Sequence, residues 1–121
     1  RQIWILGHMM GAFASAVMLV NNTRDAASDA LAGKDTLSVR IGLTASRMIY
    51  AAMLAVPYLL AASQARNWVH ALPHLTLPLA LVLAWRMATW EPSRRHNWLL
   101  ARTAHLQLAF TVLWVLALML D

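Results

Sequence analysis

The residues whose side chains could bind a ligand or take part in catalysis lie in one charged stretch, residues 21–42, between two long apolar segments. Asp25 and Asp29 are four residues apart, so on a helix their carboxylates point the same way. Three basic residues, Arg24, Lys34 and Arg40, lie close by in the sequence. Carboxylate oxygens hold Mg²⁺, and Arg or Lys side chains hold phosphate oxygens. The stretch therefore favours a metal ion that carries a phosphate-bearing substrate at a membrane surface.

Each of these features also has a simpler interpretation. A bare pair of aspartates at this spacing usually belongs to a solvated helix face. The basic residues can be charges that set membrane topology. Gly33 is expected to end the helix that carries the aspartates, because glycine often follows a last helical turn. The functional interpretation depends on all of these residues occurring together beside a membrane segment.

The composition of the chain is that of a membrane protein. Of its 121 residues, 60% are hydrophobic and only 12% are charged, whereas a soluble domain carries about 25% charged residues. Cysteine is absent, which excludes disulfides and thiolate metal sites. The formal net charge is +5, but the cations lie in short loops between apolar runs. We therefore expect membrane lipid, and no nucleic acid, as a partner.

Four apolar stretches are long enough to cross a bilayer, which takes roughly 20 residues. The fold class is therefore expected to be all-α, a polytopic membrane helix bundle. Pro57 and Pro78 are expected to kink the second and third helices. The four helices are expected at about residues 3–30, 46–65, 67–90 and 97–120.

The basic residues also predict an orientation. One side of the membrane has only Arg1 and Arg66, and the other has the remaining basic residues of the connections. Excess Lys and Arg mark the cytoplasmic side. We therefore expect the aspartate-containing loop in the cytoplasm and both termini outside. The residues that carry this asymmetry are Arg24, Lys34, Arg40 and Arg47 in the first connection and Arg86, Arg94 and Arg95 in the third.

A stripe of small residues runs along the first helix at intervals of four: Gly7, Gly11 and Ser15. Such stripes let helices approach closely in lipid. If the helix continues past Val20 at about 100° per residue, the stripe, Asn22 and both aspartates fall within a sector of about 80°. The pattern therefore predicts that the face packed against other helices also carries Asp25 and Asp29, while Arg24 points away from it.

The stretch from Asn21 to Gly42 resembles the second aspartate-rich motif of the UbiA superfamily of intramembrane prenyltransferases. It is most similar to the 1,4-dihydroxy-2-naphthoate polyprenyltransferase branch, whose pattern resembles N-N-x-R-D-x-x-x-D-x-x-A-G-K-x-T-L-x-V-R-x-G. So many matched positions are far more specific than a bare carboxylate pair. The matching residues are Asn21, Asn22, Arg24, Asp25, Asp29, Ala32, Gly33, Lys34, Thr36, Leu37, Val39, Arg40 and Gly42.

The resemblance implies that residues 1–121 are the C-terminal part of a nine-helix UbiA-type domain, because the family's first aspartate-rich motif is absent from them. The missing N-terminal helices of the same protein would complete the site. The 121-residue chain alone is therefore expected to be inactive. The location that the resemblance implies is the bacterial inner (plasma) membrane.

The resemblance also implies a reaction, in menaquinone biosynthesis. A polyprenyl diphosphate binds through Mg²⁺ and loses diphosphate, and the ring of 1,4-dihydroxy-2-naphthoate captures the allylic cation and loses its carboxylate. Carried over by position, Asp25 and Asp29 bind Mg²⁺, and Lys34 completes the catalytic set. The substrate contacts are then four residues of the same stretch: Asn21, Asn22, Arg24 and Arg40.

Two other functions stay open. The chain could belong to another branch of the superfamily with a different aromatic acceptor. It could also be a non-catalytic membrane fragment, a four-helix module that binds Mg²⁺ or lipid headgroups. The Asn-Asn-x-Arg-Asp start of the motif and its Gly-Lys-x-Thr-Leu run favour the naphthoate branch.

A few residues near the third connection have polar or aromatic side chains. His96 and Asn97 could border the diphosphate or the acceptor, although a loop role is the simpler interpretation. Arg94 and Arg95 are expected to set topology or to touch anionic lipid headgroups. Four tryptophans fall at expected membrane interfaces and are typical of an aromatic belt: Trp68, Trp85, Trp90 and Trp98.

Overall fold

The computed structural model covers residues 1–121, and all of its regular elements are helical. The 3₁₀ helix η1 runs directly into α3, and together they form one apolar segment of 22 residues, Trp68–Thr89. With the three long α-helices, this gives four segments that are long and apolar enough to cross a membrane. The expected all-α polytopic membrane bundle is confirmed. The elements are α1 (Gln2–Leu31), α2 (Leu37–Ser63), η1 (Trp68–Thr76), α3 (Leu77–Thr89) and α4 (His96–Leu120).

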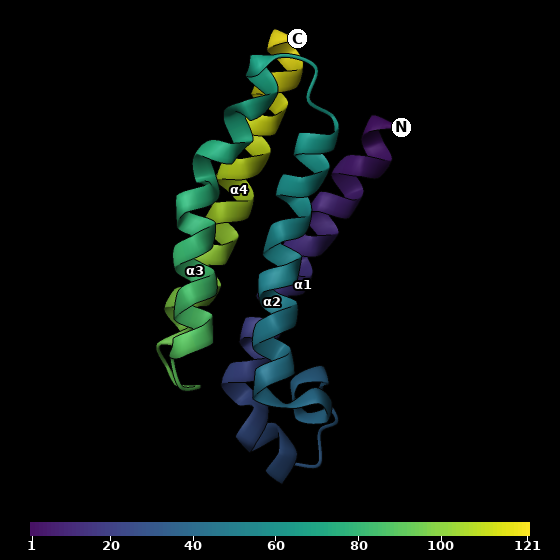
Figure 1. The fold of residues 1–121 in the computed structure, drawn as a ribbon. Helices are drawn as coiled ribbons and strands as arrows, with labels where there is room; N and C mark the ends of the chain where they lie inside the picture. The colour runs from purple at the N-terminus through teal and green to yellow at the C-terminus, as the bar shows by residue number, and fades with distance from the viewer.

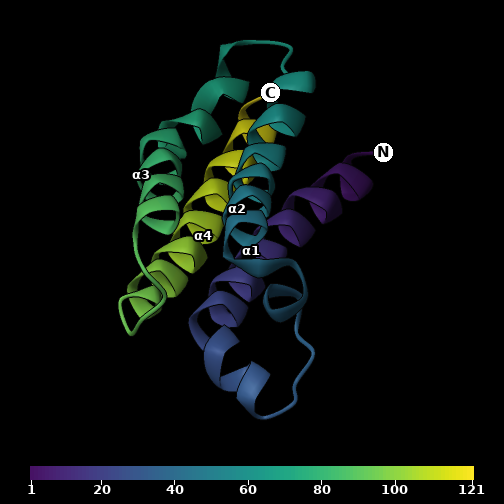
Figure 2. The ribbon, with the colours of Figure 1, turned by 60° about the horizontal axis from the view of Figure 1, so that its bottom comes forward.

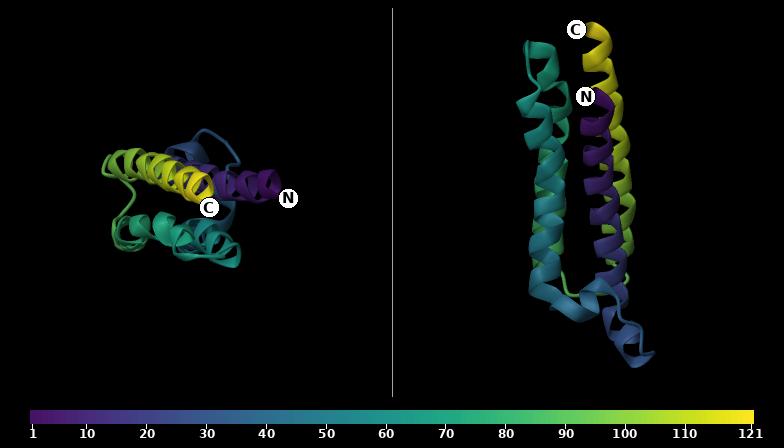
Figure 3. Two further views of the ribbon diagram at one scale, coloured as in Figure 1. Left: turned by 90° about the horizontal axis from the view of Figure 1, so that it is seen from above. Right: turned by 90° about the vertical axis from the view of Figure 1, so that its right-hand side faces the viewer.

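The helices form two layers. α1 and α4 lie in one layer, and α2 and the η1–α3 segment lie in the other, as both views in Figure 3 show. The α1–α2 and α3–α4 connections lie at one end of the bundle, and the termini and the α2–η1 connection lie at the other (Figure 1). The two basic connections therefore share one end, which we call the basic end.

Aromatic side chains from both layers meet in the core. The ring of Phe110 in α4 lies edge-on to Phe13 of α1, with centroids 5.3 Å apart. It also lies edge-on to Tyr58 of α2, at 5.2 Å. Lipid is as apolar as these side chains, so close packing and favourable ring geometry hold the helices together, rather than escape from water.

A buried hydrogen bond joins the two layers nearer the basic end. The hydroxyl groups of Tyr50 in α2 and Thr103 in α4 lie 2.8 Å apart, and both side chains are buried. Thr103 donates its own hydrogen to the carbonyl of Leu99 at 2.6 Å. Since a hydroxyl has one hydrogen to give, Tyr50 is the donor to Thr103.

The backbone of α2 leaves the helical region at Gly42, a position that the sequence did not single out, and stays helical at Pro57. Gly42 has φ 81° and ψ 176°, outside the helical region, and it is the one non-helical position within α2. Glycine has no Cβ and adopts this conformation easily. As a result α2 begins at Leu37, earlier than expected, with a short piece that lies across the basic end (Figures 2 and 3).

Pro78, which we expected to kink the third helix, lies where that segment changes from 3₁₀ to α-helix. Pro78 falls in the first turn of α3, just after η1 ends. An N–H in the first turn of a helix has no partner inside the helix, so a proline there removes no hydrogen bond. The third segment is therefore two helices of different type joined next to Pro78, and not one long α-helix.

Tyr50→Phe is expected to lower the free energy of unfolding by about 1 kcal/mol, because one buried hydrogen bond is lost while Thr103 stays bonded to Leu99. Unfolding by denaturant in detergent micelles, followed by circular dichroism, measures this change. A variant as stable as the parent chain would contradict the hydrogen bond between α2 and α4.

Candidate functional site

The guanidinium of Arg24 is the centre of a polar network at the basic end. Its Nε and Nη2 atoms donate to the two carboxylate oxygens of Asp25 at 2.8 and 2.9 Å, a bidentate pair. Nη2 also donates to Oδ1 of Asn21 at 2.6 Å. Nη1 donates to Oδ1 of Asn97 at 2.6 Å. One side chain therefore connects the end of α1 to the first turn of α4.

Two expectations from the sequence are wrong here. The helical wheel directs Arg24 away from the aspartates, but its guanidinium binds Asp25. A wheel fixes only the direction of Cβ, and the long arginine side chain carries its head group around to the neighbouring carboxylate. Asn97 has more than the simple loop role, because it accepts from Arg24. One feature of the sequence could have indicated this contact. The basic residues of the first and third connections place both connections, and so Arg24 and Asn97, on the same side of the membrane.

The geometry of the α1 C-terminus brings Lys34 to Asp29. Gly33 has φ +73°, and its N–H donates to the carbonyl of Ala30, while the N–H of Lys34 donates to the carbonyl of Asp29 at 2.8 Å. These two bonds make a Schellman motif, so Gly33 ends the helix as expected. The ammonium group of Lys34 then lies 3.9 Å from the Asp29 carboxylate, whose side chain is only 15% exposed.

The remaining expected site residues lie outside this network. Arg40 forms an ion pair with Asp35, and both side chains are more than half exposed. The sequence does not predict this role of Asp35, because it lies outside the recognised motif positions and is marked only by Arg40 five residues later. Asn22 is half-buried, and its side chain has no hydrogen bond within the chain. The structure therefore brings together Asn21, Arg24 and Asp25 in one group, and Asp29 and Lys34 in another.

Three hydroxyl groups, linked by hydrogen bonds, hold the α1–α2 connection in place. Ser46 donates its one hydrogen to the carbonyl of Gly42 at 2.7 Å, so Ser38 is the donor to Ser46, at 3.1 Å. The hydroxyl oxygen of Thr23 in α1 lies 3.2 Å from that of Ser38. All three side chains are buried. These hydrogen bonds fasten the short piece of α2 before Gly42 to both α1 and the main part of α2. Sequence reasoning missed these residues because serine and threonine are equally common in solvated loops.

The small-residue stripe of α1 does not pack against the other helices of this chain, which corrects the expectation. The buried face of α1 carries larger side chains, including Met9, Phe13 and Val20, because these give more contact area in a core. At about 100° per residue, the stripe and the aspartates lie roughly on the opposite face. The stripe lines a groove of about 620 Å³ between α1 and α2.

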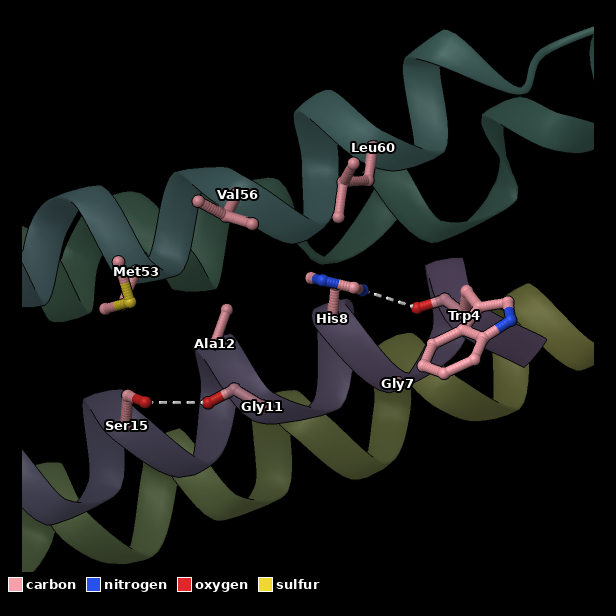
Figure 4. Close-up of a pocket in the computed structure, with 9 residues that line it drawn as sticks. All are labelled: Trp4, Gly7, His8, Gly11, Ala12, Ser15, Met53, Val56 and Leu60. Carbon is pink, nitrogen blue, oxygen red and sulfur yellow. Dashed lines mark hydrogen bonds between the residues drawn. The ribbon is translucent and has the colours of Figure 1, made fainter. Parts of the chain in front are cut away.

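Figure 4 shows the walls of this groove, with Gly7, Gly11 and Ser15 on α1 and Met53, Val56 and Leu60 on α2. The ring of His8 stands between the two helices, and its Nδ1 lies 2.7 Å from the carbonyl oxygen of Trp4. The groove is mostly apolar, and it lies along the face of α1 that carries the carboxylates further on.

The donor set fits part of a Mg²⁺ site. No group of three or more His, Cys, Asp or Glu side chains gathers anywhere in the chain. Mg²⁺ is commonly bound through one or two carboxylates together with substrate phosphates. Asp25 and Asp29 supply two carboxylates on successive turns, and Asp29 accepts no side-chain hydrogen bond. These residues fit a metal ion whose other ligands come from a substrate and from further groups.

Comparison with known proteins identifies the family. A model of the UbiA prenyltransferase family matches residues 1–108. The chain belongs to the UbiA prenyltransferase family. This confirms the resemblance that the motif at residues 21–42 indicated, and no solved structure matches the chain.

Three curated relatives show how far the similarity extends. "UbiA prenyltransferase domain-containing protein 1" of Gallus gallus is 36% identical over 107 residues, 87% of this chain and 31% of the relative. The Danio rerio protein of the same name is 47% identical over 70 residues, 56% of this chain and 21% of the relative. "1,4-dihydroxy-2-naphthoate octaprenyltransferase" of Haemophilus influenzae is 34% identical over 115 residues, 91% of this chain and 37% of the relative. The chain spans less than two fifths of the length of each of these relatives.

Gly33→Ala is expected to lower the free energy of unfolding by about 1 kcal/mol, because a Cβ disfavours the positive φ of the Schellman motif. Gly11→Ala is the matched control, since a Cβ there meets nothing within 4 Å and alanine favours a helix interior by roughly 0.5–1 kcal/mol. Denaturant unfolding in micelles compares the two variants. Equal destabilisation in both would contradict the role assigned to Gly33.

Proposed function

We propose that this chain is the C-terminal part of a UbiA-type domain that transfers a polyprenyl group from polyprenyl diphosphate to 1,4-dihydroxy-2-naphthoate. The observation that carries the proposal is the placement of Asp25 and Asp29 on successive turns of α1, each beside a cation, in a member of this family. The naphthoate octaprenyltransferase of H. influenzae supports the choice of acceptor.

The carboxylates of Asp25 and Asp29 would hold Mg²⁺, which neutralises the charge that develops on the leaving diphosphate. Arg24 orients the Asp25 carboxylate through its bidentate bonds. Lys34, whose ammonium group lies 3.9 Å from the Asp29 carboxylate, would donate to the same diphosphate, where a fixed positive charge stabilises the leaving group. These roles use the two groups of residues that the fold brings together.

Arg40 and the two asparagines have supporting roles in this proposal. The ion pair of Arg40 with Asp35 is exposed, and such pairs contribute only about 0–1 kcal/mol. Arg40 can therefore exchange Asp35 for a diphosphate oxygen at little cost. Asn21 already accepts from Arg24, and the free side chain of Asn22 can donate to a phosphate oxygen.

The groove between α1 and α2 supports a path for the prenyl chain. Its apolar walls suit an isoprenoid tail, and they would keep water from the allylic cation that forms when diphosphate leaves. In the stripe that forms one wall, Gly7 and Gly11 are exposed in this chain and Ser15 is half-buried. We propose that the N-terminal helices of the same protein cover this stripe and bring the second half of the metal site.

The membrane orientation is part of the same proposal. The basic connections share one end of the bundle (Figure 1), and an excess of Lys and Arg marks the cytoplasmic side. The aspartate end would then face the cytoplasm, in a bacterial inner membrane, where soluble diphosphate can be released.

A second candidate function is prenyl transfer to a different aromatic acceptor. Relatives named UbiA prenyltransferase domain-containing protein 1 match this chain at least as well as the naphthoate enzyme does, and their name specifies no acceptor, so similarity alone does not select the naphthoate. Product analysis with several aromatic acceptors separates the two candidates. Dihydroxynaphthoate should give a prenylated product that has lost the carboxylate.

Asp25→Asn and Asp29→Asn, each made in the full-length protein, are expected to lower kcat about 100-fold or more, because charge stabilisation at the leaving group is lost. The assay contains polyprenyl diphosphate, Mg²⁺ and dihydroxynaphthoate. Glu91→Gln is the matched control, as Glu91 is an acid at the same end with a side chain that is 85% exposed. Unchanged turnover in either aspartate variant would remove that residue from the site.

A further inference from the structure

Two tryptophans and three arginines form a stack where α3 ends and α4 begins. The guanidinium carbons of Arg86 and Arg95 lie 5.0 and 5.3 Å from the ring centroid of Trp90. The ring of Trp98 lies 5.7 Å from that of Trp90, measured between centroids. The guanidinium carbon of Arg102 lies 5.7 Å from the centroid of Trp98. We call these five residues the Trp–Arg stack.

The arginines of the stack have no acidic partner. Glu91, the acid closest in sequence, has its side chain 85% exposed and approaches Arg47 instead, at 4.0 Å. The side chains of Arg86 and Arg95 make no hydrogen bond, and Arg102 has one contact, 3.3 Å from Nη1 to Nδ1 of His105. A guanidinium that stacks on a ring uses its flat face and leaves its N–H edge available. Three guanidinium groups without a carboxylate partner therefore gather around two tryptophan rings.

The charge and position of the stack match the phosphate of a lipid. Two guanidinium groups, 5.0 and 5.3 Å from one ring centroid, carry the same charge, and a bound anion lessens their repulsion. Arginine edges bind phosphate oxygens in pairs. Trp98 is 39% exposed, and tryptophan prefers the depth of the headgroups, where one part of the ring is wet and another is apolar.

We propose that the Trp–Arg stack binds the headgroup of an anionic phospholipid at the basic end of the bundle. The phosphate accepts from the guanidinium edges, and the glycerol and upper acyl chains pack on Trp98. Basic sites between membrane helices bind anionic lipids in this way. The proposed site takes its ligand from the surrounding bilayer, and lipid binding there does not require prenyl transfer.

The stack is separate from the aspartate network. Asn97 contacts Arg24, whereas Trp98 follows it by about 100° around α4 and Arg102 lies one turn further along on the side of Trp98. A lipid on the stack therefore leaves the carboxylates of Asp25 and Asp29 open to a diphosphate. Free diphosphate is the competing explanation for the cationic cluster, and the test includes it.

The 121-residue chain, reconstituted in phosphatidylcholine nanodiscs, provides the test. Energy transfer from its tryptophans to dansyl-labelled phosphatidylglycerol, titrated against dansyl-labelled phosphatidylcholine, measures lipid preference. All variants keep the six tryptophans, so the donor signal is constant. Phosphatidylglycerol is expected to bind in preference to phosphatidylcholine, and excess inorganic pyrophosphate is expected to leave its binding unchanged.

The double variant Arg86→Gln/Arg95→Gln is expected to weaken binding of phosphatidylglycerol about 30-fold or more. Each arginine near an anionic surface contributes about 1 kcal/mol, and the position of these two beside the Trp90 ring is expected to add to that. Arg94→Gln is the nearby control, because Arg94 is exposed in the same connection but has no ring beside it. It should cost about fivefold at most. Arg1→Gln/Arg66→Gln removes the same number of charges at the other end and should weaken binding far less than Arg86→Gln/Arg95→Gln does.

Three outcomes would overturn the proposal. The first is equal binding of the two lipids by the parent chain. The second is an equal loss of binding in Arg94→Gln and a single Arg95→Gln variant, which would indicate diffuse charge and not a built site. The third is displacement of the labelled lipid by inorganic pyrophosphate, which would assign the cluster to a free anion. Circular dichroism of each variant verifies that the helices are intact.

Discussion

The guanidinium of Arg24 makes four hydrogen bonds, and through them the end of α1 is fixed against the start of α4. Two of these bonds orient the Asp25 carboxylate, and one reaches Asn97 on the neighbouring helix α4. The position of the carboxylate and the position of the third connection therefore depend on the same side chain. Since that connection also carries Trp90 and Arg95, the whole basic end is organised around one contact.

Two further constraints shape the basic end. Positive φ values at Gly33 and Gly42 let the chain turn sharply at each side of the α1–α2 connection. The buried hydroxyl groups of Thr23, Ser38 and Ser46 hold the turned piece in place. Arg47 adds a link to the third segment by donating to the carbonyls of Met87 and Trp90 at 3.0 and 2.8 Å. There it satisfies carbonyls that the end of α3 leaves without partners.

α1 has two different faces, and this division explains how a core and a groove exist side by side. Large side chains such as Phe13 form the core with α2 and α4. Small residues on the opposite side leave space against α2. The carboxylates stand at the end of the small-residue face, so the polar site and the groove follow from one helical repeat.

The helical segments could be predicted well from the sequence, because apolar length alone decides whether a helix can cross a membrane. The end of α1 at Gly33 could be predicted too, since its signal is local. The contact between Arg24 and Asn97 could not, because the two residues are 73 positions apart and no local pattern spans such a separation.

The faces of α1 and the interruption of α2 were not predictable for different reasons. A helical wheel gives the angles between residues, but it does not say which face other helices will cover. The wheel therefore could not show that the small-residue stripe lies on the face of α1 opposite to the buried one. Pro57 draws attention as a helix breaker, but a membrane helix can accommodate a proline, whereas the backbone of Gly42 leaves the helical region altogether.

A double-mutant cycle between Arg24 and Asn97 tests most directly whether this contact organises the basic end. The free energy of unfolding in micelles is measured for the parent chain, Arg24→Gln, Asn97→Ala and the double variant. We expect a coupling energy of about 1 kcal/mol, the value of a partly exposed hydrogen bond to a charged group, and additive effects when Asn67→Ala at the opposite end replaces Asn97→Ala. Additive effects for Arg24 and Asn97 themselves would contradict the account.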